Sequence, residues 1–474
     1  MPRGPRAPHD LYSPERPTAV VLSGVGADGA YHAGVLKALH DAGVKVDLVA
    51  GRGVGALGAL LFAVDGAATL WEPLGFWRRQ GLQAGYRFTW QYRAIGGALA
   101  AVAALVVSPL VLLAGAIAVW PIALALGLVG LEAGATLATA YADLVAWAFA
   151  PGQLPTWVPR LALLVSGSVA VALAAGAAWA AVRSPRRQIG AAPWRLLGGP
   201  IDSRGFARLA TGALWDLLRG GAALPRPTAP DLSQRYAELL ASSAGQPGQR
   251  DLLLAIHDVD ARRDLVVGHV GGEAGTRLFP PASGPASRRA EAFAVTTDAR
   301  SQLADVVAAA ATLPAVSDPH PIRFAADGYW RGEVHRASDR PGLLIRLLEE
   351  TAAAGVEQVL VVTATPDAAP PHALRPARVD LRGRLSEWLA GEETAAVRDA
   401  VRFAHAHFHA VFVIRPPHNA IGPLDLGGAD DAAADRRLVL DELVARGADD
   451  AHRLFIEPAL GAAGDKVMEA GWGR

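Results

Sequence analysis

Two glycine-rich turns near the start of the 474-residue chain have the composition of an anion-binding or catalytic loop. The first reads Gly24-Val25-Gly26-Ala27-Asp28-Gly29 and fits the pattern G-x-G-x-x-G. Backbone amides in such a turn, with the N-terminus of a following helix, can hold a dinucleotide pyrophosphate or the oxyanion of an acyl-transfer intermediate. The first turn therefore admits two kinds of chemistry.

The dinucleotide interpretation also requires an acidic residue at the end of the second strand, about 20 residues further on. Asp47 stands at the beginning of that strand, whereas Arg52 stands near its end and would suit the 2′-phosphate of NADP. An NADP site formed by the three glycines Gly24, Gly26 and Gly29 together with Arg52 is therefore kept as an alternative.

The second turn reads Gly51-Arg52-Gly53-Val54-Gly55 and has the spacing of a nucleophile elbow, G-x-S-x-G. In an elbow the central serine attacks an ester, and the glycines allow the sharp turn that exposes it. Here the central residue is Gly53, which has no hydroxyl and cannot act as a nucleophile.

Alternating strand and helix patterns surround both turns and predict an α/β domain. Residues 18–23 and 46–50 are expected to be strands, each followed by a turn and then a helix, at 30–42 and 56–64. Later in the chain, strands are expected at 251–257, 264–269, 357–364 and 410–415, and helices at 290–311, 394–403 and 432–447.

A long apolar stretch interrupts this pattern. The segment 94–182 contains only three charged residues, Glu132, Asp143 and Arg160. A bilayer core of ~30 Å needs about 20 apolar helical residues, so spans are expected near 95–119 and 161–182. Residues 121–150 would then be interfacial or re-entrant, although four spans remain an alternative.

Arginines on both sides of this stretch set its expected orientation. The positive-inside rule places both flanks, and with them the α/β domain, on the cytoplasmic side of the cell membrane as part of a multi-pass protein. The arginines are Arg78, Arg79, Arg87 and Arg93 before the insert and Arg183, Arg186, Arg187 and Arg195 after it.

Composition excludes several other classes. The net charge is zero, which argues against a nucleic-acid partner, and the chain has no cysteine for disulfides or thiolate metal sites. His405, His407 and His409 alternate and would share a face on a strand, where they would suit zinc. Ordinary surface histidines are the favoured interpretation, and no metal or other cofactor is expected.

Three groups of motifs in the chain resemble those of a single protein family. The segment LSGVGADGAYHAGVLKALHDAGVKVDLVAGRGVGALGALLFA is similar to the N-terminal motif of the patatin-like phospholipases, a G-G-G-x-[KR]-G loop followed by G-V-L and G-x-S-x-G. AATLPAVSDPHPIRFAADGYWRGE resembles the family's A-S-x-x-x-P segment and Asp-Gly motif. HNAIGPLDLGGADD and DRRLVLDELVARGADDAHRLFIEP resemble the C-terminal part of a bacterial subgroup.

The resemblance implies a three-layer α/β sandwich with a mainly parallel central sheet, interrupted by a helical transmembrane insert. It also implies an acyl-ester hydrolase site with a Ser-Asp dyad, an oxyanion loop and an elbow. Carried over by motif, these are Gly53 in the nucleophile position, Asp327 as the dyad acid, Gly24, Val25, Gly26 and Gly29 as the oxyanion loop, and Gly51, Arg52, Val54 and Gly55 as the elbow.

The chain departs from the family pattern at four positions of this one site. Gly53 replaces the serine, Val25 the middle glycine and Asp28 the basic residue, while Tyr329 follows the Asp-Gly motif in place of glycine or alanine. Four departures together predict a degenerate member that has lost hydrolysis and binds lipid or a protein partner, another copy of the chain included. An active hydrolase with an unconventional nucleophile is the alternative.

The expected organisation divides the chain into six parts. They are a disordered tail (1–17), the N-terminal part of the patatin-like domain (18–66), a membrane-proximal linker (67–93), the transmembrane insert (94–182), a connector (183–250) and the C-terminal part of the domain (251–474).

Overall fold

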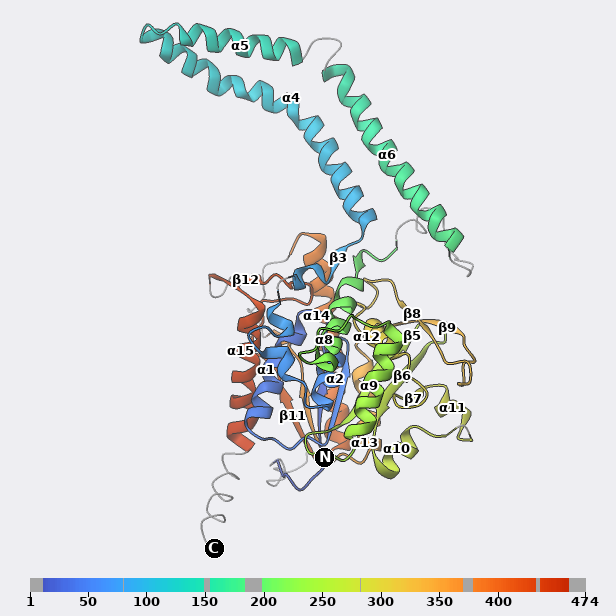
Figure 1. Ribbon diagram of the computed structural model, residues 1–474. Helices are drawn as coiled ribbons and strands as arrows, with labels where there is room; N and C mark the ends of the chain where they lie inside the picture. The colour runs from blue at the N-terminus through green and yellow to red at the C-terminus, as the bar shows by residue number, and fades with distance from the viewer. Residues whose placement is uncertain are drawn as a thin grey trace, which may run out of the picture. The chain divides into compact units, whose positions relative to one another are not determined.

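The computed structural model describes residues 12–79, 81–148, 154–183, 198–281, 283–369, 378–431 and 435–459 (Figure 1). The chain divides into two compact units, which are described separately. Unit 1 consists of Met1–Arg87 and Ile201–Arg474, and unit 2 of Phe88–Pro200.

A mixed, mostly parallel sheet forms the centre of unit 1. Its strands follow the order β11-β10-β1-β2-β5-β6-β7, and the first five are parallel to one another. β6 runs antiparallel to β5, and β9 pairs with the end of β5 and with β8. The strands are β1 (Thr18–Leu22), β2 (Leu48–Arg52), β5 (Asp251–Asp258), β6 (Arg263–His269), β7 (Ala292–Ala294), β8 (His320–Arg323), β9 (Val334–Ser338), β10 (Gln358–Val362) and β11 (Ala410–Ile414).

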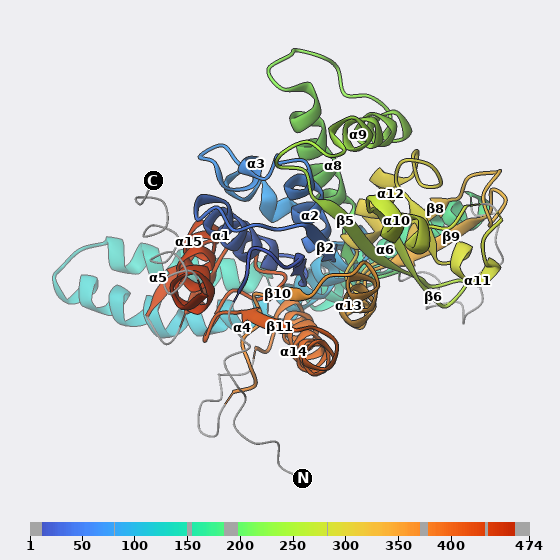
Figure 2. The same cartoon turned by 90° about the horizontal axis from the view of Figure 1, so that it is seen from below.

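Helices cover both faces of the sheet, which confirms the expected fold class (Figure 2). One face carries α1 (Asp28–Asp41), α2 (Gly55–Ala63) and α15 (Leu440–Ala451), and the other α13 (Leu343–Ala353) and α14 (Leu381–His407). Strand β1 is buried along its whole length, as expected for a parallel strand covered on both faces.

Shorter elements complete unit 1. Helices α8 (Arg204–Arg219) and α9 (Ala229–Ser243) pack on α12 (Leu303–Ala310), which also contacts α2. The others are α3 (Ala68–Trp71), η1 (Phe76–Arg78), η2 (Leu82–Ala84), β3 (Arg87–Phe88) paired with β4 (Ile201–Asp202), α10 (Gly272–Leu278), α11 (Ala286–Arg289), β12 (Ala429–Asp431) paired with β13 (Arg436–Leu438), and the π-helical turn η3 (His452–Ile456).

The structure corrects one expected helix and removes one alternative interpretation. The single helix expected at 290–311 is instead strand β7, a turn and helix α12, because β7 gains a hydrogen-bonding partner in β6. The alternating histidines do not share a strand: His405 and His407 lie at the end of α14, where residues two apart face different directions. Among the described residues, no group of three or more acidic or histidine side chains is placed to hold a metal ion.

Segments expected to be tail, linker and connector contribute to unit 1. Tyr12 is buried and its hydroxyl donates a hydrogen bond to the carbonyl oxygen of Lys45. Phe76 and Trp77 from the expected linker are buried, and so is Phe206 from the expected connector, where the three rings contact one another. Residues 1–11 of the tail and 184–197 of the connector, including three of the expected arginines, lie outside the described residues.

Unit 2 consists of three helices, α4 (Trp90–Leu128), α5 (Ala133–Ala148) and α6 (Leu154–Arg183). Helix α4 continues through Pro109 and Pro121, so residues 121–128 extend it rather than forming a separate interfacial segment. α5 packs against α4, where Gly134 lies against the backbone of Ala123.

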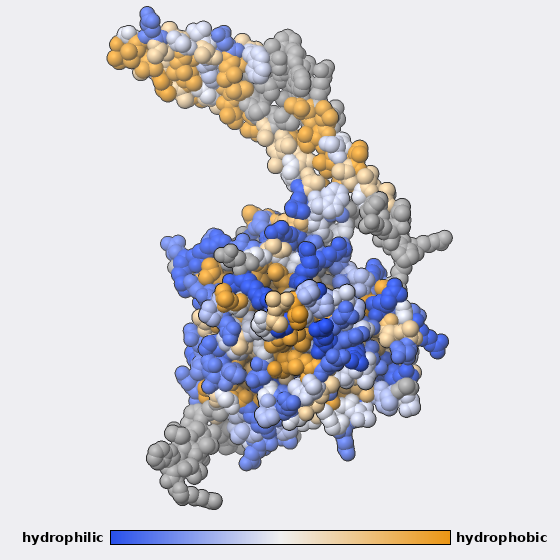
Figure 3. Space-filling view, in the orientation of Figure 1, coloured by the Kyte–Doolittle hydropathy of each residue, from blue (hydrophilic) through white to orange (hydrophobic). Residues whose placement is uncertain are grey.

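Much of the surface of unit 2 is apolar (Figure 3). Leu110–Leu128 of α4 has a mean hydropathy of 2.3, and only 6% of this segment is buried. It is the one helical segment in the described residues that is long and apolar enough to cross a membrane, and Leu164–Gly176 of α6 is a shorter apolar helix. By length and composition, this segment of α4 is therefore a candidate membrane span.

Candidate functional site

The two glycine turns meet at one edge of the central sheet. The first leaves the carboxyl end of β1 and leads into α1, and the second connects the carboxyl end of β2 to α2. Because β1 and β2 are parallel neighbours, their carboxyl ends lie side by side, which is where ligands bind in open α/β sheets. The contact is direct, since the amide of Val54 donates to the carbonyl oxygen of Gly24 at 3.1 Å.

Gly53 occupies the tip of the second turn with φ at +57°, a left-handed conformation that favours glycine. A Cβ atom added to Gly53 would lie 2.1 Å from the carbonyl oxygen of Gly24 and 3.0 Å from Oδ2 of Asp339. The space that a nucleophilic side chain needs is therefore filled by the backbone of the first turn.

Internal acceptors occupy backbone amides of the oxyanion loop. The amide of Val25 donates to Oδ2 of Asp28 at 2.8 Å, and the amide of Ala27 donates to the carbonyl oxygen of Pro423 at 2.8 Å. The amide after the nucleophile position, that of Val54, is also engaged, as described above. An oxyanion hole needs such donors directed at the developing charge, and here their hydrogen bonds go to the protein itself.

Close packing within the protein requires glycine at the three glycine positions of G-x-G-x-x-G, so a bound ligand is not needed to account for them. A Cβ on Gly24 would meet the side chain of Asp28 at 2.6 Å, and one on Gly29 would meet the indole of Trp77 at 2.1 Å. Gly26, with φ at +59°, lies under Pro423, whose carbonyl oxygen would be 1.8 Å from an added Cβ. The first turn is thus covered by Trp77 and by the segment around Pro423.

Arg52 is fully buried and makes hydrogen bonds with all five of its N–H groups. Its Nε and Nη2 donate to the carboxylate of Asp339, and its Nη1 and Nη2 donate to that of Glu393, both at 2.7 Å. Nη1 also donates to the hydroxyl of Ser23 at 3.1 Å. We call Ser23, Arg52, Asp339 and Glu393 the Arg52 cluster. It ties the carboxyl ends of β1 and β2 to the residue after β9 and to α14.

Burial shifts the protonation of the groups around the cluster. Desolvation raises the pKa of Asp28 to about 7, and the nearby carboxylate of Glu393 adds to the increase. Desolvation also raises the pKa of Asp339, although Arg52 opposes it. Burial lowers the pKa of His32 to about 4, so this histidine is neutral at pH 7. Burial alone would lower the pKa of Arg52, but its two carboxylate partners raise it, so the guanidinium stays charged.

The structure brings most of the expected site residues together, with Asp327 as the exception. Gly51 and Gly55 form the base of the second turn, where an added Cβ on Gly55 would meet the carbonyl oxygen of Leu22 at 2.4 Å. Asp327 is exposed, in the loop between β8 and β9, and Tyr329 beside it is 38% exposed. The carboxylate next to Gly53 is instead that of Asp339.

Sequence reasoning did not single out the residues that cover and lock this site. Asp339 and Glu393 lie 287 and 341 residues from Arg52. Trp77 belongs to a segment with no recognised motif, and Pro423 lies in a segment that resembles the family but was given no role at the site. The sequence did contain one signal for these carboxylates, which is Arg52, because an arginine in a buried strand needs buried carboxylate partners.

This geometry limits the chemistry of the turns. Gly53 supplies no nucleophile, and the amides of Val25, Ala27 and Val54 already have acceptors. Arg52 is unavailable to a 2′-phosphate because both carboxylates hold it inside the protein, which removes the basis of the NADP alternative.

The sheet order and the adjoining loop and elbow turns define an α/β protein built on a hydrolase-type scaffold. A family model of patatin-like phospholipases matches residues 20–334, which is well over half of the chain. The chain belongs to the patatin-like phospholipase family.

Curated relatives match over a short segment only. Patatin-like phospholipase domain-containing protein 6 of mouse, human and the orangutan Pongo abelii is 51% identical to the chain over 51 residues. That segment is 11% of this chain and 4% of the length of each relative. Among solved structures, VipD from Legionella pneumophila aligns with 93% of this chain and 66% of its own, at 12% identity and a TM-score of 0.26. The family assignment therefore rests on the family model.

Proposed function

We propose that this protein is a membrane-anchored, catalytically silent patatin-like protein that acts by binding lipid or a protein partner. The observation that carries the proposal is the position of the Gly24 carbonyl oxygen, 2.1 Å from any Cβ that residue 53 would have. The site thus lacks a nucleophile and also lacks the space for one.

The second support is the occupation of the oxyanion loop. In a hydrolase the loop amides stabilise charge that develops on the substrate, and losing one such donor costs about 10²–10³-fold in rate. Here the donors at Val25 and Ala27 are held by Asp28 and Pro423. Recovery of hydrolysis would require several groups to move together.

An enzymatic assay tests the proposal against an active hydrolase with an unconventional nucleophile. Purified full-length protein is incubated with phospholipid vesicles and with p-nitrophenyl butyrate, and product release is compared with that of buffer. We expect no release above buffer. Turnover that is abolished in Asp327→Ala or Asp339→Asn would overturn the proposal and favour the active enzyme.

For anchoring, we propose that unit 2 enters and leaves the membrane on the same side. Leu110–Leu128 is about 28 Å long at 1.5 Å per residue, which matches a bilayer core of ~30 Å, and α6, which carries the shorter apolar segment Leu164–Gly176, would make the return crossing. The family domain would then lie on the cytoplasmic face of the membrane.

Because the chain has no cysteine, single-cysteine labelling tests this topology directly. Glu132→Cys lies between α4 and α5, and Ser242→Cys lies on the exposed surface of α9. In intact cells a membrane-impermeant maleimide should label Glu132→Cys but not Ser242→Cys, and permeabilisation should expose both. Equal labelling of the two variants in intact cells would contradict a same-side insert.

A further inference from the structure

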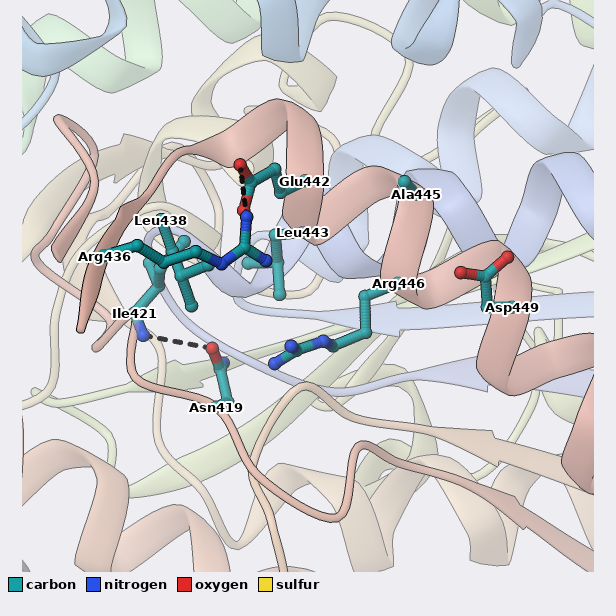
Figure 4. A pocket seen from close by; sticks show the side chains of 9 residues that line it. All are labelled: Asn419, Ile421, Arg436, Leu438, Glu442, Leu443, Ala445, Arg446 and Asp449. Atoms are coloured by element: carbon teal, nitrogen blue, oxygen red, sulfur yellow. Dashed lines mark hydrogen bonds and ion pairs between the residues drawn. The ribbon is translucent and has the colours of Figure 1, made fainter. Parts of the chain in front are cut away.

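A cavity of about 330 Å³ is lined in part by Asn419 and Ile421, which precede Pro423 in the segment that covers the first turn (Figure 4). It is bounded by α15, β13 and the segment around Asn419 and Ile421. Pocket sizes for small ligands begin at about 300 Å³, so the volume suits one small molecule.

Buried apolar side chains form one part of the cavity wall. Ile421, Leu438 and Leu443 line it, and each is only 3% exposed. Asn419 is fixed by its own hydrogen bonds, since its Nδ2 donates to the carbonyl oxygen of Ala364 and its Oδ1 accepts from the amide of Ile421, both at 3.1 Å. The cavity is therefore shaped by side chains that the core holds in place.

Arg446 supplies a positive charge to this cavity. Its Nη1 donates to the carbonyl oxygen of His418 at 2.9 Å, and its guanidinium extends from α15 toward Asn419 (Figure 4). Within the part of the chain that the structure describes, no carboxylate lies within ion-pairing distance of it. Arg436, the other arginine of the cavity, is paired with Glu442 at 3.2 Å. Arg446 thus keeps N–H groups for a ligand.

We propose that this cavity binds the carboxylate of a medium-chain fatty acid, with the head group on Arg446 and the chain along the apolar wall. A guanidinium binds a carboxylate through two parallel charge-assisted hydrogen bonds. At ~30 Å³ per water-sized group, the volume holds roughly eleven such groups. Octanoate, which has ten non-hydrogen atoms, fits this size.

The acidic residues of the cavity do not oppose this ligand. Arg436 offsets the charge of Glu442, and Asp449 is exposed to solvent on α15. The apolar wall selects a hydrocarbon chain over a small inorganic anion.

Occupancy of the cavity would stabilise the cover of the first turn. Asn419 and Ile421 touch the ligand space, and Pro423, two residues on, holds the amide of Ala27. The cavity lies outside the elbow, so the proposal stands whether or not the protein hydrolyses esters.

Calorimetric titration of full-length protein in lipid nanodiscs with octanoate tests the inference, with empty nanodiscs as the blank. We expect saturable binding with one site per chain. Octanamide, which is neutral and of similar shape, should bind at least tenfold more weakly, because it loses the charge-assisted bonds to Arg446.

Three variants locate the site. Arg446→Ala should weaken octanoate binding at least tenfold. Arg453→Ala, which removes an exposed arginine from η3, is the control and should change octanoate binding less than twofold. Ala445→Phe adds a ring at an exposed lining position and should block the cavity even if Arg446→Ala proves unstable. Absence of saturable binding, equal binding of octanamide, or undiminished binding by Ala445→Phe would each overturn the proposal.

Discussion

The carbonyl oxygen of Gly24 lies 2.1 Å from the position that a Cβ atom on Gly53 would occupy. The oxyanion loop and the elbow, which in a hydrolase leave room for a substrate between them, are here in contact. The amide of Val54 donates to the same oxygen at 3.1 Å, so the contact is also a hydrogen bond that would have to break for the site to open.

Gly53→Ser should therefore not create a hydrolase. The added side chain would clash with Gly24, and the left-handed backbone would be strained by ~1–2 kcal/mol in addition to a packing cost of ~1–3 kcal/mol. We expect a lower unfolding midpoint and no release of p-nitrophenol from p-nitrophenyl butyrate.

Gly43→Ser is the matched control for that variant. Gly43 has φ at +65°, close to that of Gly53, but an added Cβ there meets nothing within 4 Å. Gly43→Ser should lose stability only through the strain of the left-handed backbone, ~1–2 kcal/mol. Equal destabilisation by the two substitutions would show that Gly24 does not block residue 53.

Arg52→Met should be strongly destabilising. The substitution leaves the carboxylates of Asp339 and Glu393 buried without a cation, and removing one partner of a buried ion pair costs ~3–5 kcal/mol. Arg336→Met, which removes an arginine paired with Asp260 at a 55% exposed position, should cost less than ~1 kcal/mol. Urea unfolding followed by circular dichroism measures both free energies of unfolding. A small loss of stability in Arg52→Met would contradict the role of the Arg52 cluster in holding the fold together.

Asp327 and Asp339 should differ sharply. Asp327→Ala changes an exposed loop side chain and should alter the free energy of unfolding by no more than ~0.5 kcal/mol. Asp339→Ala removes a fully buried partner of Arg52 and should lower the free energy of unfolding by ~3–5 kcal/mol, as for other broken buried ion pairs. If Asp327→Ala were the more destabilising of the two, the assignment of the buried carboxylate would be wrong.

Stability should depend on pH through Asp28. Its pKa rises from 3.8 to about 7 on folding, so between these values the folded protein keeps a proton that the unfolded chain loses. The contribution of Asp28 is therefore full below about pH 4 and declines toward pH 7, by ~1.4 kcal/mol per pH unit. Burial lowers the pKa of His32 to about 4, which acts in the opposite direction between pH 6.5 and 4.

Asp28→Asn isolates the carboxylate, because the amide oxygen can still accept from Val25. Urea midpoints measured between pH 4 and 7.5 should fall more steeply with rising pH in the wild type than in Asp28→Asn. Parallel profiles would mean that Asp28 ionises normally in the folded protein.

Removing unit 2 should release unit 1 from membranes. β3 and β4 pair with each other, and the amide of Thr89 donates to the carbonyl oxygen of Pro200, so a short Gly-Ser linker replacing 90–199 can join Thr89 to Pro200. We expect the shortened protein in the soluble fraction without detergent, with the circular dichroism of an α/β protein. Sedimentation with membranes at the level of the full chain would contradict an anchor in unit 2.

Local sequence was enough for the elements near the two turns. The apolar runs and glycines of 18–66 predicted β1, α1, β2 and α2 within two residues at each boundary, because turn chemistry and short-range periodicity decide them. The helix expected at 290–311 failed because β7 forms only where β6 offers it a partner, a contact that local periodicity does not encode.

The sequence by itself determined the family motifs, the missing serine at Gly53 and the apolar character of the insert, since each depends on residue type and spacing. Only the tertiary structure decided that the site is closed and which carboxylate lies beside it. Asp339, Glu393 and Pro423 reach the turns from segments hundreds of residues away. Their roles depend on how the strands and helices pack, and burial then makes each of these polar groups take a partner within the protein.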